Sequence, residues 1–230
     1  MANLYHVPEL PEPGPATLEG DVGHHLVRVL RVRPGDEVLL CDGRGRTTRA
    51  VIVSTGRREV AVDVGPATAH QPPCPSVLLA FACPRPARAD WLIEHGTEVG
   101  VAAFQAIWTE RSRPQQVRVD RWRKIAAAAA GQCARPHLPD VREPLELGAF
   151  LASALPARRL LAAGDGGPLE EAGDPLPAAV LIGPEGGFTP TETDSIAAAG
   201  FVATSLGPHS LRTETAALVS AALLLQAARR

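Results

Sequence analysis

Long apolar runs are absent from this 230-residue sequence, although 45% of its residues are hydrophobic. No stretch stays apolar over the roughly 20 residues that a membrane-spanning helix needs, so we expect no membrane span. The first residues, Met1–His6, lack the basic region and apolar run of a secretory signal peptide. The four cysteines form no Cys-x-x-Cys pair and no cluster with histidine, so we expect no metal site. Scattered single cysteines are typical of the reducing cytoplasm, where we expect the protein to act.

A strong charge of either sign is also missing. The formal net charge of −2 gives no general argument for a polyanionic partner. The distribution is uneven, since ten Lys and Arg stand against six Asp and Glu between Arg85 and Arg142. This excess permits a basic face on the folded chain, but a solvated helix surface explains it nearly as well.

Two segments near the carboxyl end share one plan, in which an apolar run meets Gly-Pro and then a helix start. The first is Leu181–Glu192, with the sequence Leu-Ile-Gly-Pro-Glu-Gly-Gly-Phe-Thr-Pro-Thr-Glu, and the second is Leu206–Ala216, with Leu-Gly-Pro-His-Ser-Leu-Arg-Thr-Glu-Thr-Ala. Thr189 is placed to cap a helix that has Pro190 at its first position and Glu192 closing a capping box. Two such strand-to-helix turns lying side by side would place a ligand at the carboxyl edge of a parallel sheet.

These two strings resemble the paired signature of the SPOUT methyltransferases, and more narrowly the bacterial family that methylates N3 of a uridine in small-subunit (16S) ribosomal RNA. The resemblance extends to partial matches at Asp90–Ile93, Thr97–Gly100, Glu110–Ser112 and Gln132–Pro139. The chain departs from the family strings at Arg85, where Lys is usual, at Gly131, where Glu is usual, and at His209, where Arg is usual. The last two departures put carried-over contacts at those positions in doubt.

The resemblance implies S-adenosylmethionine as cofactor, methyl transfer to RNA, a homodimer and a trefoil knot in the C-terminal domain. Its implied partner is small-subunit ribosomal RNA or the assembled subunit. We expect Arg212 to stabilise negative charge on the base and Glu185 to accept a proton, whereas Glu214 is expected to complement a helix N-terminus. The cofactor residues implied by the resemblance are Ile182, Gly183, Glu185, Gly187, Leu206, Gly207, Ser210 and Leu211.

Residues 1–70 are expected to form a small β-barrel, which the resemblance identifies as a PUA-like RNA-binding domain. Strands are predicted at 38–41, 48–53 and 59–64, with one helix at 24–31 capped by Asp21. Arg28 and Arg31 on this helix fit the family's RNA-binding string, although a solvated helix edge explains them as well. The resemblance also implies RNA contacts for Arg85 and Arg111.

Residues 71–230 are expected to form an α/β domain after the proline-rich linker Ala69–Ser76. The run 77–83 is apolar without alternation, as in a strand buried on both faces of a parallel sheet. Further strands are predicted at 102–108, 159–162, 178–182 and 201–206. Helices are predicted at 90–99, at 120–132 with Asp120 as cap, and between Val141 and the strand at 159, with a loop over Gly164–Pro177. An apolar stripe over Ala216–Leu225 suits either a dimer interface or core packing.

Three other functions remain open at this point. The same signature serves ribose 2′-O methylation of RNA, which mapping the methyl group to base or sugar would separate. A non-catalytic RNA-binding module would bind RNA without S-adenosylmethionine. A phosphate-binding enzyme could use the glycine-rich turns, but neither turn is followed by the Lys of a Walker motif.

Overall fold

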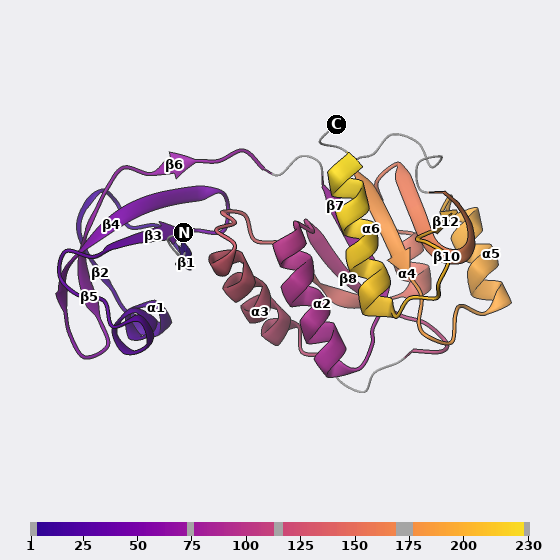
Figure 1. Ribbon diagram of the computed structural model, residues 1–230, viewed down its shortest axis with the longest axis horizontal. Coiled ribbons are helices and arrows are strands. Elements are labelled where there is room, and N and C mark those ends of the chain that lie inside the picture. Colours follow the sequence, from indigo (N-terminus) through magenta and orange to yellow (C-terminus); the bar gives the residue numbers. More distant parts are fainter. Residues whose placement is uncertain (1–3, 73–75, 113–116, 169–176, 228–230) are drawn as a thin grey trace. The chain divides into compact units, whose positions relative to one another are not determined.

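The computed structural model describes residues 4–72, 76–112, 117–168 and 177–227. The chain divides into two compact units (Figure 1). Unit 1 contains Met1–Pro72 and Ala127–Leu138, and unit 2 contains Pro73–Ala126 and Pro139–Arg230. Part of the predicted linker, residues 73–75, lies outside the described residues. Within the described ranges, no helix is long and apolar enough to cross a membrane.

Unit 2 is built on one six-stranded sheet in which every neighbouring pair of strands is parallel. The strand order across the sheet is β12-β10-β11-β7-β8-β9. The strands are β7 (Val77–Ala82), β8 (Ala103–Trp108), β9 (Asp140–Glu146), β10 (Arg158–Pro168), β11 (Ala178–Ile182) and β12 (Val202–Ser205). This confirms the α/β class predicted from the apolar runs.

Helices cover both faces of this sheet. They are α2 (Pro86–Val99), α3 (Val119–Gln132), α4 (Leu147–Leu151), α5 (Pro190–Ala198) and α6 (Thr213–Ala227). Helices α2, α6 and the first half of α3 pack on one face, while α4 and α5 pack on the other. The sheet is therefore buried on both sides, which explains why its central strands are apolar at every position.

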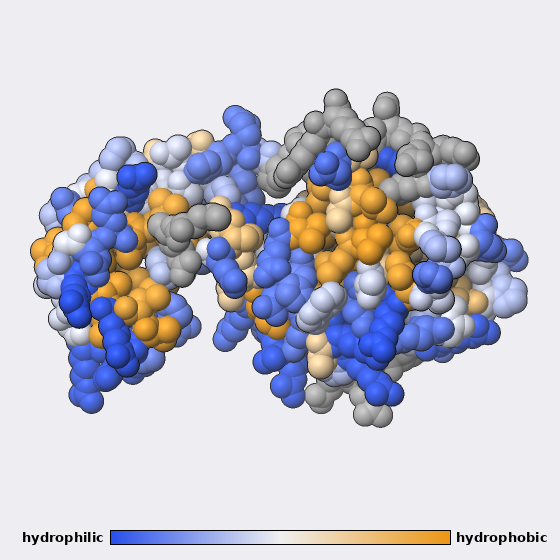
Figure 2. Space-filling model, in the orientation of Figure 1, coloured by the Kyte–Doolittle hydropathy of each residue, from blue (hydrophilic) through white to orange (hydrophobic). Residues whose placement is uncertain are grey.

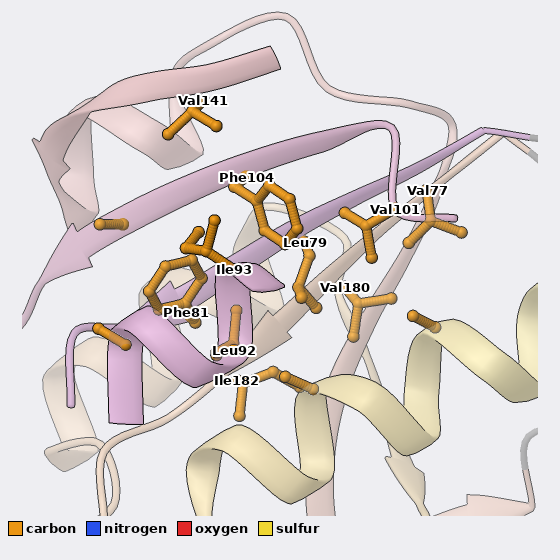
Figure 3. Packing of buried hydrophobic residues seen from close by; sticks show 14 of the residues in the cluster. Val77, Leu79, Phe81, Leu92, Ile93, Val101, Phe104, Val141, Val180 and Ile182 are labelled. Atoms are coloured by element: carbon orange, nitrogen blue, oxygen red, sulfur yellow. The ribbon is translucent and has the colours of Figure 1, made fainter. Parts of the chain in front are cut away.

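The side chains of β7 show how one strand serves both faces. Leu79 and Phe81 point into the core beneath α2 and α6, whereas Leu78 and Ala80 point into the core beneath α4 and α5. Figure 3 shows the first of these cores, where Phe81 lies close to Ile93 of α2. All six residues of β7 are buried, and burying a large apolar side chain contributes about 1.5–3 kcal/mol.

Two segments of unit 2 differ from the sequence predictions. The helix predicted between Val141 and the strand at 159 is present but spans only Leu147–Leu151, because Asp140–Glu146 forms the edge strand β9. The loop predicted over Gly164–Pro177 is wrong at its start, because β10 continues to Pro168 through a register shift after Ala162. The rest of that loop, 169–176, lies outside the described residues.

The starts of two helices in unit 2 were predicted from capping residues. Thr189 and Glu192 form the predicted capping box of α5, with Pro190 at the first helical position. Asp120, expected as a cap, lies instead inside the first turn of α3. There its carboxylate complements the positive end of the helix dipole.

Unit 1 is a curved sheet around its own apolar core, with strand order β1-β3-β4-β5-β2 and β6 paired to β4. Its strands are β1 (Leu4–His6), β2 (Gly14–Leu18), β3 (Glu37–Cys41), β4 (Arg46–Thr55), β5 (Val60–Val64) and β6 (Thr68–Ala69). The alternating burial of Val60, Val62 and Val64 is that of a half-buried strand, as predicted. The core also contains inward-facing residues of β3 and β4.

The helical segment predicted in unit 1 at 24–31 begins earlier than expected. Helix α1 spans Gly20–His25 with Glu19 as N-cap, so Asp21 lies in the first turn and is not the cap. It continues into η1 (Leu26–Leu30), a π-helix that ends at Arg31 in a left-handed conformation. π-Helical turns are rare and frequently occur at functional sites.

The glycine at position 131, where Glu is usual in the family strings, is explained by packing inside unit 1. A Cβ at this position would lie 2.6 Å from the carbonyl oxygen of Leu4. The end of α3 therefore approaches β1 more closely than any residue with a side chain permits. A glutamate at this position would have to push the two segments apart.

Candidate functional site

The two Gly-Pro motifs meet at one cavity of about 580 Å³ in unit 2. Its walls come from the carboxyl ends of β10, β11 and β12, where ligands of open parallel sheets generally bind. The two motif strands are not neighbours, because β10 lies between β11 and β12. Contrary to the sequence prediction, the two turns are therefore not side by side, although both line the same cavity.

All eight residues predicted to bind the cofactor lie on the wall of this cavity. They are Ile182, Gly183, Glu185, Gly187, Leu206, Gly207, Ser210 and Leu211. Other residues, which were not among the predicted cofactor residues, also line it, among them Asp165, Phe188, Thr193 and His209. The extension of β10 beyond Ala162 brings Asp165 there. No sequence signal marked it, because Gly164–Gly167 has the composition of a loop.

Glycines shape the cavity at three positions. Gly187 has φ +67° and Gly207 has φ +133°, backbone conformations that side chains rarely adopt. A Cβ at either position would meet no atom within 4 Å, so these two glycines border open space. Gly183 is needed for a different reason, because a Cβ there would lie 2.8 Å from the ring of Phe188. The glycine-rich turn, Gly183–Phe188, therefore folds back closely on itself.

Side chains from the end of β8 and from α5 hold the glycine-rich turn from outside. Arg111, just after β8, donates a 2.6 Å hydrogen bond to the carbonyl of Gly186. The buried carboxylate of Glu192 accepts from the backbone N–H of Glu110 and of Thr189, each at 2.9 Å. Both oxygens of this carboxylate are thereby satisfied, and the turn is fixed to the neighbouring strand end.

The two motifs are also tied to each other. The Thr213 hydroxyl, at the start of α6, donates a 3.0 Å hydrogen bond to the carbonyl of Gly183. Arg88 of α2 lies 3.0 Å from Glu185 and 3.5 Å from Glu214, and so joins a carboxylate of each motif. Sequence reasoning missed Arg88, because nothing in its local pattern relates it to carboxylates 97 residues or more away.

The two carboxylates beside Arg88 have different surroundings. The Glu214 side chain is only 10% exposed, whereas the Glu185 side chain is 54% exposed and lines the cavity. Within the part of the chain that the structure describes, Oε2 of Glu214 is buried and has no hydrogen-bond partner. Glu185 is therefore the carboxylate of the pair that a bound substrate can reach.

Arg212 is exposed and does not line the cavity. Among the described residues, its side chain forms no ion pair with Glu185 or Glu214, and both of these carboxylates contact Arg88. Its backbone carbonyl accepts the hydrogen bond from the Ala216 N–H that opens α6. The guanidinium is thus exposed to solvent and forms no ion pair with the described residues.

The four residues predicted to bind RNA are divided between the two units. Arg28 and Arg31 lie in unit 1, on η1 and at its end, and both are exposed. Arg85 is the N-cap residue of α2 in unit 2. Arg111 supports the glycine-rich turn, as described above, and remains exposed.

The chemistry of the cavity wall fits S-adenosylmethionine, which carries a sulfonium and an ammonium. Two carboxylates, Asp165 and Glu185, line the cavity, and no Lys or Arg is among its described lining residues. The side chains of Leu206, Leu211 and Phe188 supply apolar surface for an adenine ring. Cys83 does not line this cavity, and burial raises the pKa of its thiol to about 12.

The sequence matches two family models, described as the RNA methyltransferase domain over residues 70–225 and the RNA methyltransferase PUA domain over residues 18–65. Among curated proteins, the ribosomal RNA small subunit methyltransferase E of Mycobacterium bovis is 35% identical over 96% of this chain and 90% of that protein. The protein of the same name from Synechocystis is 34% identical over 86% of this chain and 69% of its own length.

Solved structures show the same similarity. A ribosomal RNA small subunit methyltransferase E from Neisseria gonorrhoeae bound to S-adenosylmethionine has a TM-score of 0.91 at 26% identity, covering 99% of this chain and 98% of that one. A Legionella pneumophila protein in complex with the same cofactor has a TM-score of 0.92 at 28% identity, with coverage of 99% and 98%. Both structures were determined with S-adenosylmethionine bound.

Proposed function

Because the chain belongs to the RNA methyltransferase family and is an S-adenosylmethionine-dependent enzyme, we propose that it methylates N3 of a uridine in small-subunit ribosomal RNA. The observation that carries this proposal is the convergence of both Gly-Pro motifs on one cavity at the carboxyl ends of β10, β11 and β12. Relatives named ribosomal RNA small subunit methyltransferase E support the RNA substrate.

The cofactor is held, in this proposal, by the backbone of the glycine-rich turn and of residues 206–211. Gly187 and Gly207 leave room for close approach, while Asp165 and Glu185 complement its positive charge. When bound, S-adenosylmethionine supplies an electrophilic methyl carbon without a metal or a covalent enzyme intermediate. The protein's own contribution is then to position the base and to remove the proton from uridine N3.

Arg212 and Glu185 are the residues we assign to that task. Uridine N3 is protonated at neutral pH and must lose its proton to become a nucleophile. Glu185 lines the cavity and is exposed, so it can accept the proton directly or through water. Arg212 can donate two hydrogen bonds to a uracil carbonyl and so stabilise the negative charge that develops on the base. Alignment of the reacting atoms can itself contribute roughly 7–11 kcal/mol to the acceleration.

The two units divide the work in this proposal. Unit 1, whose main part is residues 1–70, docks the RNA, and unit 2 carries the chemistry, in the cytoplasm, where small-subunit RNA is found. A homodimer is supported by the apolar area over α6 in Figure 2, where Leu223 is exposed and Leu218, Val219 and Leu225 are partly exposed. The trefoil knot implied by the family resemblance stays a prediction for this chain.

The test is to incubate the purified protein with methyl-labelled S-adenosylmethionine and either naked small-subunit RNA or assembled subunits that lack the modification. Digestion to nucleosides should yield label in 3-methyluridine. Label in a 2′-O-methyl nucleoside would instead establish ribose methylation, and label in neither would refute the proposal. Comparing the two substrates tells whether RNA or the assembled subunit is recognised.

A further inference from the structure

Three arginines and a histidine of unit 1 surround one pocket, and two of the arginines belong to no motif noted in the sequence. The pocket has a volume of about 420 Å³ and is lined by His24, Arg28, Arg57 and Arg58. His24 lies in the last turn of α1, Arg28 lies on η1, and the other two arginines form the turn between β4 and β5. We propose that this pocket binds a backbone phosphate of the RNA substrate, with Arg57 and Arg58 as its principal donors.

The pocket is produced by a close approach of two backbones. Gly23 of α1 is buried, and a Cβ there would lie 2.7 Å from the carbonyl oxygen of Arg58. Only glycine therefore allows α1 to pack directly against the β4–β5 turn. This packing sets Arg28 and His24, on the helical segment, opposite Arg57 and Arg58.

The turn itself presents both arginines outward. Thr55 pairs with Val60 at the end of the hairpin, and the Gly56 N–H donates a 2.9 Å hydrogen bond to the Glu59 carbonyl. Arg57 and Arg58 are the two central residues of this closed turn, and both are exposed. A hydrogen-bonded turn fixes the origins of both side chains, so less freedom is lost when they bind an anion.

The charge of the pocket is not neutralised by the protein. Across the described residues, no carboxylate lies within ion-pair distance of His24, Arg28, Arg57 or Arg58. Three guanidinium groups around one pocket repel each other, and an anion placed between them relieves that repulsion. The planar guanidinium binds phosphate oxygens bidentately, so phosphate is the anion that this group of arginines fits.

RNA is the source of phosphate that we infer, and this inference rests on the proposed function. The turn arginines extend the RNA-binding assignment of Arg28 to a segment that is distant in sequence. Arg31 lies outside this pocket, since η1 ends there in a left-handed residue. We therefore expect Arg57 and Arg58 to contribute more to RNA affinity than Arg31 does.

The experiment compares two charge-matched double variants of the full-length protein. Arg57→Ala with Arg58→Ala removes two pocket charges, while Arg46→Ala with Arg49→Ala removes two arginines from β4 outside the pocket. Binding of labelled small-subunit RNA is measured between about 50 and 300 mM salt, a range wide enough to resolve the slope of log affinity against log salt. Titration with S-adenosylmethionine checks that unit 2 is unaffected.

The pocket variant should bind RNA at least about tenfold more weakly at low salt, and its slope should be flatter by about 0.7–0.9 for each phosphate that is no longer neutralised. The control variant should change both quantities less. Equal effects of the two variants, or no effect of the pocket variant, would refute phosphate binding by this pocket while leaving the proposed function intact. If the wild-type protein binds S-adenosylmethionine but no RNA in any form, the proposed function and the pocket both fail.

Discussion

Replacing Arg88 tests whether one guanidinium holds the two motifs together. In Arg88→Ala, the carboxylate of Glu214, which is 10% exposed, is left without its ion-pair partner. Breaking a fully buried pair costs about 3–5 kcal/mol, whereas an exposed pair contributes about 0–1 kcal/mol. Because the Arg88 side chain is 34% exposed, we place the cost between these limits, at about 2 kcal/mol.

A cost of this size should lower the melting temperature by about 4–8 °C for a chain of this length. The matched variant is Arg88→Ala combined with Glu214→Gln, which removes the unpaired charge and should recover more than half of the lost stability. Differential scanning calorimetry measures both. If Arg88→Ala melts like the wild type, or if Glu214→Gln fails to restore it, then Arg88 does not hold the motifs. A parallel titration should show weaker S-adenosylmethionine binding in Arg88→Ala, since Glu185 also loses its partner.

Three further predictions concern the cavity, the base and unit 1. Gly187→Val should abolish S-adenosylmethionine binding. The backbone conformation at φ +67° costs a β-branched residue about 1–2 kcal/mol, and the valine side chain would enter the open space of the cavity. A folded variant that binds the cofactor with wild-type affinity in calorimetry would contradict this. Arg212→Ala should lower single-turnover methylation roughly 10²-fold with cofactor affinity and melting temperature unchanged; weaker cofactor binding instead would assign Arg212 a structural role. Burial lowers the pKa of His6 below its ordinary value of 6.5, so the folded state binds fewer protons than the unfolded state there. The free energy of unfolding should therefore lose no His6 contribution above about pH 6.5 and should decrease as the pH falls from there through the lowered pKa of His6. In His6→Gln this decrease should be shallower. Parallel plots of unfolding free energy against pH for the two proteins would refute this prediction.

Local signals predicted most of the framework of unit 2. The apolar run at 77–83 lacks alternation because both faces of β7 are covered, and that requirement is visible in the sequence. The capping box of Thr189 and Glu192 is likewise a local pattern, and it forms as predicted. The two Gly-Pro motifs identified the cavity residues because each follows a strand that ends at the same edge of the sheet.

Features that depend on distant neighbours could not be predicted in this way. The edge strand β9 carries charged residues such as Arg142 and Glu143, and its strand conformation comes from pairing with β8. The extension of β10 depends on β12, where Gly167 pairs with Thr204. A Cβ at Gly166 would have no room beside the backbone of Thr204. Glycine at this position therefore reflects the close approach of β10 to β12 and does not indicate a loop.

The conformation of the glycine-rich turn is held by side chains from outside that turn. The glycine-rich turn has the conformational freedom that close approach to a ligand requires, and such freedom alone would leave it disordered. Arg111 binds the carbonyl of Gly186 and Arg88 binds Glu185, each from a segment at least 75 residues earlier in the chain. Thr213 adds a bond to the carbonyl of Gly183 from the other side. The motif therefore supplies a backbone able to adopt the binding conformation, and α2, the end of β8 and α6 select that conformation before a ligand arrives.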